Sequence, residues 1–334
     1  MAGPDSLTAS VRARLKPRLD YLPVSLFGGV MGLLGLSAGW RVAHTVLGAP
    51  EAIAAGIGLF AVAAFVAVSL AYIVKLVTAP RAVAAEFNHL VAGNLFGTFS
   101  ISLLLLPLIL VHYSQPLAQG VWIAGVIVMA AFGWASATRW ISRPHEVAHI
   151  TPAWVVPVVG LLDVPIALPF LQMPGLHPLA VFGLAIGFVF ALPIFTLGLG
   201  RLIAGPPLAD ALKPTLLMLV APFAVGFSGY VATTGKDDLF ADGLYMATLF
   251  LLSVLLWRLV RVLPGTAFKL GWWGMSFPLA ASAIAALRYA GYHPGAIAAG
   301  IGAALLALAT VAIAGLLLRT LIGLVRGEFR ALSI

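Results

Sequence analysis

Ten long apolar segments alternate with short polar connections along almost the whole chain. A helix needs about 20 apolar residues to cross a hydrocarbon core roughly 30 Å thick, and these segments reach that length without the period-two alternation of membrane β-barrel strands. The pattern therefore predicts an all-α polytopic membrane protein with ten transmembrane helices. The predicted spans are residues 22–45, 50–77, 90–112, 117–138, 151–171, 177–200, 214–234, 239–262, 268–290 and 294–318.

The connections are too short to hold an inserted soluble domain. We expect a cytoplasmic N-terminal tail at residues 1–21, a ten-helix transmembrane domain at 22–318 and a cytoplasmic C-terminal tail at 319–334. Residues 1–21 have basic side chains but no apolar core, so a cleaved signal peptide is not expected and the first span serves as the targeting signal. The C-terminal tail mixes basic and apolar residues, which predicts an amphipathic extension on the membrane surface.

The odd-numbered spans carry most of the prolines and hydroxyl groups, whereas the second and tenth spans are mostly Ala, Gly, Leu, Val and Ile. A proline removes a backbone donor and kinks a helix, and in a bilayer the freed backbone groups are tolerated only against protein or water. The five odd spans are therefore predicted to form an inner ring of kinked helices around a pore, with the five even spans as a lipid-facing outer ring. A packed bundle without a lumen is the alternative.

The ninth span, KLGWWGMSFPLAASAIAALRY, is broken near its middle. Pro278 cannot donate to the carbonyl of Gly274, so a kink is expected there, and Phe277 lies on backbone that the following proline pushes away from helical geometry. Prolines also recur along the chain at intervals of 58, 57 and 56 residues, which suggests a repeated helix-hairpin unit. These prolines are Pro107, Pro165, Pro222 and Pro278, and the last three are the predicted pore kinks.

Composition and charge support a membrane protein and exclude several other classes. Hydrophobic residues make up 62% of the chain, charged residues 9%, and the mean hydropathy is +1.08, so a soluble domain is excluded. The net charge of +8 is spread between spans and forms no nucleic-acid-binding stripe. If the N-terminus is cytoplasmic, only three of the 19 Lys and Arg residues face outward, which predicts that both termini are cytoplasmic. Those three are Arg41, Lys236 and Arg288.

The predicted lumen would be lined by small residues, hydroxyl groups and backbone exposed at the kinks. Weak hydrogen-bond donors and partial charges at helix ends suit rapid passage of anions more than tight capture. Asp163 is the exception, because a carboxylate near mid-membrane costs on the order of 3 kcal/mol. It is either a proton-coupling group or a hydrogen-bonded structural acid. The pore-lining candidates are Ser25, Gly28, Ser100, Ser102, Asp163, Ser228, Ser276 and Ser282.

The sequence His145–His149, HEVAH, matches the H-E-x-x-H pattern of zinc proteases. Pro144 and Pro152 leave room for barely two helical turns around it, and Asp163 is about 21 Å further along a regular helix, too far to be a third ligand. We therefore interpret the match as chance. The chain also has no cysteine, so no thiolate site is possible. No catalytic residue, metal or cofactor is expected.

Four stretches together resemble the tellurite-resistance/dicarboxylate transporter family, which includes bacterial TehA-like proteins, fungal malate and sulfite transporters and the plant slow-type guard-cell anion channel. The W-x-x-S-F-P segment in the ninth span is the most specific part of this resemblance. The resemblance implies five helical hairpins, an anion pore within each subunit, a homotrimer, and a gating role for Phe277. The stretches are Leu22–Leu36, Thr151–Gly160, Lys213–Tyr230 and Gly271–Ala281.

The expected function is a gated channel that passes small monovalent anions such as chloride or nitrate and is occluded by Phe277. A proton-coupled transporter or exporter of C4-dicarboxylates, sulfite or tellurite-like oxyanions, with Asp163 as the coupling group, is the alternative. The expected partners are small anions, the lipid bilayer and further copies of the chain, with no nucleic acid. The expected location is the inner membrane of a bacterium.

Overall fold

The computed structural model describes residues 19–262 and 265–333, so residues 1–18 of the predicted N-terminal tail lie outside the described part of the chain. Within that part, ten helical segments are long and apolar enough to cross a membrane. The predicted all-α fold and its ten spans are therefore confirmed. Boundaries lie within a few residues of those predicted, except that the last helix runs on to Val325.

The first span and all five even spans are each built on one continuous α-helix. These helices are α2 (Leu26–Leu47), α3 (Glu51–Thr78), α7 (Gln115–Ser142), α10 (His177–Ala204), α12 (Leu239–Val262) and α14 (Ala296–Val325). Short elements before, between or after the spans are α4 (Pro80–Asn88), η2 (Val147–His149), η6 (Pro174–Leu176) and α15 (Phe329–Ser333), where η denotes a 3-10 helix.

The other four odd spans change helix type along their length. The third consists of η1 (Ala92–Phe96), α5 (Gly97–Leu105) and α6 (Pro107–Leu110). The fifth consists of η3 (Pro152–Val155), α8 (Val156–Val159), η4 (Gly160–Asp163), α9 (Val164–Ala167) and η5 (Leu168–Phe170). The seventh consists of η7 (Asp210–Val220) and α11 (Ala221–Thr234), and the ninth of η8 (Leu270–Met275) and α13 (Ser276–Tyr292).

Prolines lie at these changes because a helix can begin at a proline but cannot easily continue through one. Pro165, Pro222 and Pro278 each fall in the first turn of an α segment, where the backbone donor that proline lacks would have no partner within the helix. In the ninth span the break falls between Met275 and Ser276, one turn closer to the start than the proline itself. Phe277 is therefore helical, which differs from the non-helical backbone expected before a proline.

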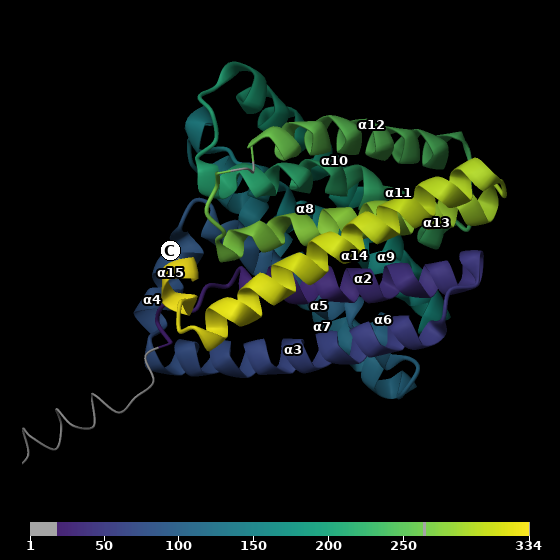
Figure 1. The fold of residues 1–334 in the computed structure, drawn as a ribbon, viewed down its shortest axis with the longest axis horizontal. Helices are drawn as coiled ribbons and strands as arrows, with labels where there is room; N and C mark the ends of the chain where they lie inside the picture. Colours follow the sequence, from purple (N-terminus) through teal and green to yellow (C-terminus); the bar gives the residue numbers. More distant parts are fainter. Residues whose placement is uncertain (1–18, 263–264, 334) are drawn as a thin grey trace, which may run out of the picture.

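Odd and even spans differ sharply in burial. In the most apolar window of each span, 67–83% of the residues are buried in odd spans and 11–39% in even spans. Figure 1 shows α3 and α12 along opposite edges of the bundle, with α2 and α13 between them and α14 running across the front. This difference in burial is expected if the odd spans form an inner layer of helices and the even spans an outer layer.

Glycines bring α2 and the ninth span into close contact. A Cβ atom added at Gly32 would collide with the hydroxyl group of Ser276, and one added at Gly35 would lie 3.1 Å from both the Phe277 ring and Ala280 Cβ. The spacing of the two glycines puts them on one face of α2. That face can therefore approach the start of α13 more closely than any larger residue would permit.

The bundle has two ends, which we call the Lys75 end, where α3 meets α4, and the Arg41 end, where α2 meets α3. At the Lys75 end the ammonium group of Lys75 donates to Glu86 Oε2 and to the carbonyl of Leu22, both at 2.6 Å. Glu86 also accepts from the backbone N–H of Val24 at 2.6 Å and from the Tyr72 hydroxyl at 2.9 Å. One carboxylate thus ties α3 and α4 to the entry of α2.

Residues 328–333 fold back onto the Lys75 end. Gly327 has a positive φ of 69°, which reverses the chain after α14. The following helix α15 buries Leu332 beside Gly323. Lys269, at the start of the ninth span, donates to the carbonyl of Ala331 at 2.8 Å.

Candidate functional site

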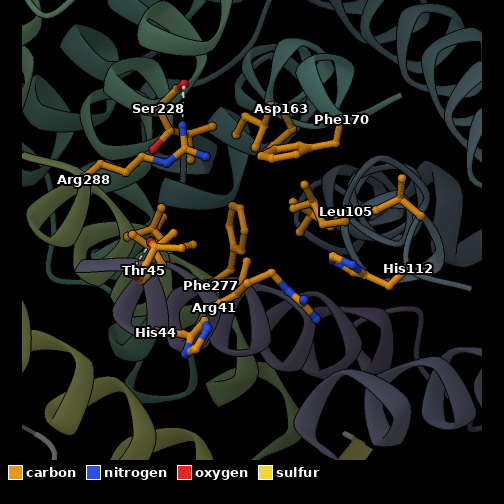
Figure 2. A pocket seen from close by; sticks show the side chains of 18 of the residues that line it. Arg41, His44, Thr45, Leu105, His112, Asp163, Phe170, Ser228, Phe277 and Arg288 are labelled. Atoms are coloured by element: carbon orange, nitrogen blue, oxygen red, sulfur yellow. Dashed lines mark hydrogen bonds between the residues drawn. The ribbon is translucent and has the colours of Figure 1, made fainter. Parts of the chain in front are cut away.

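One cavity of about 350 Å³ opens at the Arg41 end and is lined by residues from all five odd spans (Figure 2). Only Glu51 on its wall comes from an even span, at the very start of α3. A single space bordered by every odd span is the arrangement expected if these spans surround a common axis. Representative lining residues are Arg41 from α2, His112 just after α6, Asp163 from η4, Ser228 from α11, and Phe277 and Arg288 from α13.

Phe277 lies at the inner end of this cavity and is 4% exposed. Figure 2 shows its ring projecting into the space between the labelled side chains. Phe277 and Arg288 are eleven residues apart on α13, which corresponds to about 16 Å along the helix and about half of the hydrocarbon core. Towards the Lys75 end, Trp273 and Ser276 are buried against the glycine face of α2. The cavity therefore ends at Phe277.

Two arginines line the wall near the mouth, as Figure 2 shows. Arg41 forms an ion pair with Glu51 at 3.6 Å, and Arg288 donates to the backbone carbonyl of Ser228 at 3.5 Å. Guanidinium groups keep their charge at all physiological pH values, and charge concentrated in a cleft raises the local concentration of counter-ions. Their place on the cavity wall therefore suits the two arginines to concentrate anions at the mouth.

His112 is a titratable residue of the mouth that the sequence did not single out. Partial burial and the nearby Arg41 guanidinium lower the pKa of His112 below its ordinary value, against an opposing effect of Glu51. The imidazole is therefore neutral near pH 7 and gains a charge only in more acidic solution. The position of His112 at the end of an odd span, like that of Arg288, was the one feature of the sequence that could have identified it as a residue of the mouth.

Asp163 lies on the cavity wall with no exposed surface of its own. Neither of its carboxylate oxygens accepts a hydrogen bond from any group in the described part of the chain. A buried carboxylate without a partner is costly in apolar surroundings, so packing alone does not explain this residue. The structural role that we considered from sequence, a hydrogen-bonded acid, has no donor among the described residues.

The other predicted lining residues have different surroundings. The hydroxyl groups of Ser102, Ser276 and Ser282 donate to backbone carbonyls within their own spans at 2.6–2.7 Å. Together with Ser25, Gly28 and Ser100, they do not border this cavity, which brings together only Asp163, Ser228 and Phe277 of the predicted set.

The HEVAH segment does not form the helix that a zinc protease needs. Val147–His149 is a single 3-10 turn, and Glu146 has extended backbone. His145 packs edge-on against Trp154 with ring centroids 5.0 Å apart, whereas His149 faces Glu146 at 3.8 Å. The two imidazoles thus have different neighbours, in agreement with a chance match to the motif.

Comparison with known proteins finds a matching family and several relatives. A family model described as a voltage-dependent anion channel matches residues 21–321. The S-type anion channel SLAH3 of Arabidopsis thaliana is 28% identical over 316 residues, which cover 92% of this chain and 49% of that protein. The guard cell S-type anion channel SLAC1 of the same plant is 25% identical over 295 residues, covering 84% of this chain and 51% of that protein.

A relative from an archaeon also matches. The uncharacterized transporter MJ0762 of Methanocaldococcus jannaschii is 26% identical over 233 residues, covering 62% of this chain and 67% of that protein. The chain spans about half the length of the plant relatives that it matches.

Proposed function

The chain belongs to the voltage-dependent anion channel family, and from this premise and the cavity that ends at Phe277 we propose that it is a gated anion channel. Membership of this family makes the chain an integral membrane protein of anion transport and not an enzyme. Several relatives are named as anion channels, which supports the proposal that this chain also conducts anions. The observation that carries the proposal is a cavity lined by all five odd spans whose inner end is a single aromatic ring.

The conducted species are small monovalent anions such as chloride or nitrate. They enter the mouth past Arg41 and Arg288, where positive charge raises their local concentration. Beyond the mouth most of the lining side chains are apolar, such as Leu105 and Ile166, and Ser228 adds a hydroxyl group, so the path solvates an anion weakly without trapping it. Phe277 closes the path by filling it and by excluding water.

Sidedness and assembly complete the proposal. We infer that the Lys75 end and both termini face the cytoplasm, because most of the Lys and Arg residues lie in the connections and tails predicted for that side. An inside-negative potential then drives anions outward with about 2.3 kcal/mol per charge per 100 mV. By the resemblance set out above, the protein is a homotrimer with one pore per subunit, in the inner membrane of a bacterium.

The deciding experiment compares wild type with Phe277→Ala in liposomes under a chloride or nitrate gradient. Removing the ring opens the path, so flux should rise on the order of tenfold or more, equivalent to lowering a barrier by about 1.4 kcal/mol. Phe227→Ala is the matched control, because Phe227 is fully buried on α11 but does not border the cavity. Unchanged flux in a folded Phe277→Ala protein would overturn the gate.

A second candidate function rests on Asp163. An unpaired carboxylate on the same cavity as Phe277 is a site at which a proton and a substrate anion can meet. In this alternative the protein is a proton-coupled transporter of C4-dicarboxylates, sulfite or tellurite-like oxyanions.

A further inference from the structure

A second cluster of titratable side chains lies at the Arg41 end, outside the cavity lining. It consists of Asp237 in the connection between α11 and α12, Asp242 in the first turn of α12, and His293 directly after α13. One potential ligand atom from each residue lies within 4.8 Å of the other two. Nε2 of His293 is 2.7 Å from Asp237 Oδ2 and 3.4 Å from Asp242 Oδ1.

The two carboxylates are not satisfied by the protein around them. The Asp237 side chain is only 9% exposed, yet its Oδ1 is buried and accepts no hydrogen bond from the described residues. Oδ1 of Asp242 is in the same condition. The neighbouring Asp238 is different, because it caps the start of α12 through two backbone N–H groups and accepts from the Tyr230 hydroxyl at 2.7 Å. Among these three neighbouring acids, the buried oxygens without a hydrogen-bond donor therefore belong to the two that face His293.

A proton on His293 does not account for this arrangement. It provides one hydrogen bond, to Asp237 Oδ2, and an ion-pair contact of 3.4 Å with Asp242 Oδ1, but it gives neither Oδ1 atom a hydrogen bond. A divalent cation interacts with several oxygens at once, so it would satisfy both carboxylates. The ring of His293 is stacked on Tyr289 with centroids 4.3 Å apart, which orients Nε2 towards the acids.

We propose that Asp237, Asp242 and His293 form a binding site for a divalent transition-metal ion of the Zn²⁺ class. One imidazole nitrogen with two carboxylates suits Zn²⁺ better than Ca²⁺ or Mg²⁺, which prefer all-oxygen sites. With bonds of 2.0–2.1 Å, ligand atoms of a tetrahedral site lie about 3.3 Å apart. The separation of 3.4 Å between Asp242 Oδ1 and His293 Nε2 already fits, and the separation of 2.7 Å between Asp237 Oδ2 and His293 Nε2 must widen by about 0.6 Å.

The site joins two helical hairpins. Asp237 and Asp242 belong to the α11–α12 hairpin, and His293 belongs to the connection between α13 and α14. A bound ion would fix the outer end of α13, the helix that carries Phe277 and Arg288, against the neighbouring hairpin. His293 is 44% exposed, so the ion can enter from solvent at the Arg41 end.

The test uses the purified full chain, stripped with a chelator and titrated with ZnCl₂ by calorimetry, with metal content checked by elemental analysis. We expect one zinc per chain in wild type. In His293→Ala and in Asp242→Asn the affinity should fall by roughly 100-fold or more, since losing even an outer partner of a metal ligand costs about 10- to 100-fold. Asp242 is partly exposed, so its variant should fold even if the His293 variant does not.

His149→Ala is the matched control, because His149 is similarly exposed and lies 3.8 Å from a carboxylate at the other end of the molecule. It should bind zinc like wild type, and zinc should raise the melting temperature of both. Equal zinc affinity in wild type, His293→Ala and Asp242→Asn would overturn the proposal, as would the absence of zinc binding in wild type. None of these measurements involves anion flux, so the outcome is independent of the proposed channel function.

Discussion

Phe277 owes its position to the lack of a side chain at the neighbouring Gly35. Gly35 has no side chain, so the aromatic ring and Ala280 lie where a methyl group on α2 would be 3.1 Å from each. Both neighbours are buried, which leaves them little room to retreat. The conformation of the ring is therefore set jointly by α2 and α13, and not by the proline next to it alone.

Gly35→Ala tests this joint control. The added methyl group overpacks a filled interior, so we expect destabilisation of about 1–3 kcal/mol and a changed chloride flux as the ring is displaced. Thermal unfolding in detergent and liposome flux measure the two effects. Gly56→Ala is the control, because a Cβ at Gly56 in α3 meets no atom within 4 Å. Equal melting temperatures for Gly35→Ala and wild type would contradict this account of the packing.

His112 predicts a pH dependence of conduction. The charged and titratable groups around it are Arg41, which lowers its pKa, Glu51, which raises it, and the cavity residues His44, Asp163 and Arg288. Because the pKa of His112 is below the ordinary value of about 6.5, protonation adds positive charge to the mouth only as the pH falls below that value.

Anion flux through Phe277→Ala should therefore rise as the pH is lowered from 7 towards 5. In a His112→Gln background the rise should disappear, since glutamine adds no charge. His149→Gln, at the opposite end, should leave it intact. A pH profile that survives His112→Gln would assign the titration to another group of the mouth.

At the scale of elements, the Lys75 end depends on one buried ion pair. The side chains of Lys75 and Glu86 are 3% and 13% exposed, and the pair joins α3 and α4 to the entry of α2. Such a pair is not strongly stabilising relative to apolar residues, but removing one partner leaves the other charge buried. The cost of breaking it should therefore be large.

Glu86→Gln should lower the free energy of unfolding by about 3 kcal/mol or more, because Lys75 loses its counter-charge while the shape is kept. The control is Glu328→Gln, which breaks the half-exposed pair between Arg319 and Glu328 and should cost less than about 1 kcal/mol. Thermal or denaturant unfolding in detergent measures both. Similar losses in the two variants would mean that burial at the Lys75 end does not govern this interaction.

The spans themselves were predictable, and their internal structure was not. A run of apolar residues sets where a helix crosses the membrane, so the number of spans and most boundaries follow from hydropathy. The same run does not reveal whether a segment is α or 3-10, since both bury apolar side chains. The eleven residues of η7 are an example, because their mixed pattern carries no sign of 3-10 geometry. Prolines predicted only that breaks would occur nearby.

For the candidate site, three of the residues predicted from sequence do line the cavity, namely Phe277, Asp163 and Ser228. Three other predicted hydroxyl groups donate to backbone carbonyls and do not face the cavity. A serine in a helix has both options, and its composition does not decide between them. The cluster of Asp237, Asp242 and His293, which we propose as a metal site, was also not singled out from sequence. Its residues are up to 56 positions apart, from Asp237 to His293, and only the packing of two hairpins brings them together.

At the scale of the whole molecule, the cavity is open at one end and ends at Phe277 in the first turn of α13, about half-way across the hydrocarbon core, a shape that both a closed channel and a one-sided carrier can have. The two differ in what Asp163 must do. A channel freed of Phe277 is continuous between the two sides, so each ion passes without a proton. A carrier must reverse its opening in every cycle, and a carboxylate that changes charge can couple that reversal to a proton.

We therefore expect nitrate flux through the double variant Phe277→Ala/Asp163→Asn to persist without a pH gradient and to rise in proportion to concentration. Asparagine keeps the size of the side chain but cannot ionise, so it separates packing from coupling. Ser228→Ala in the same background is the control for a polar change on the same wall. Flux that instead saturates, requires a pH gradient in wild type and is lost in Asp163→Asn alone would establish the coupled carrier and make Phe277 a part of its packing.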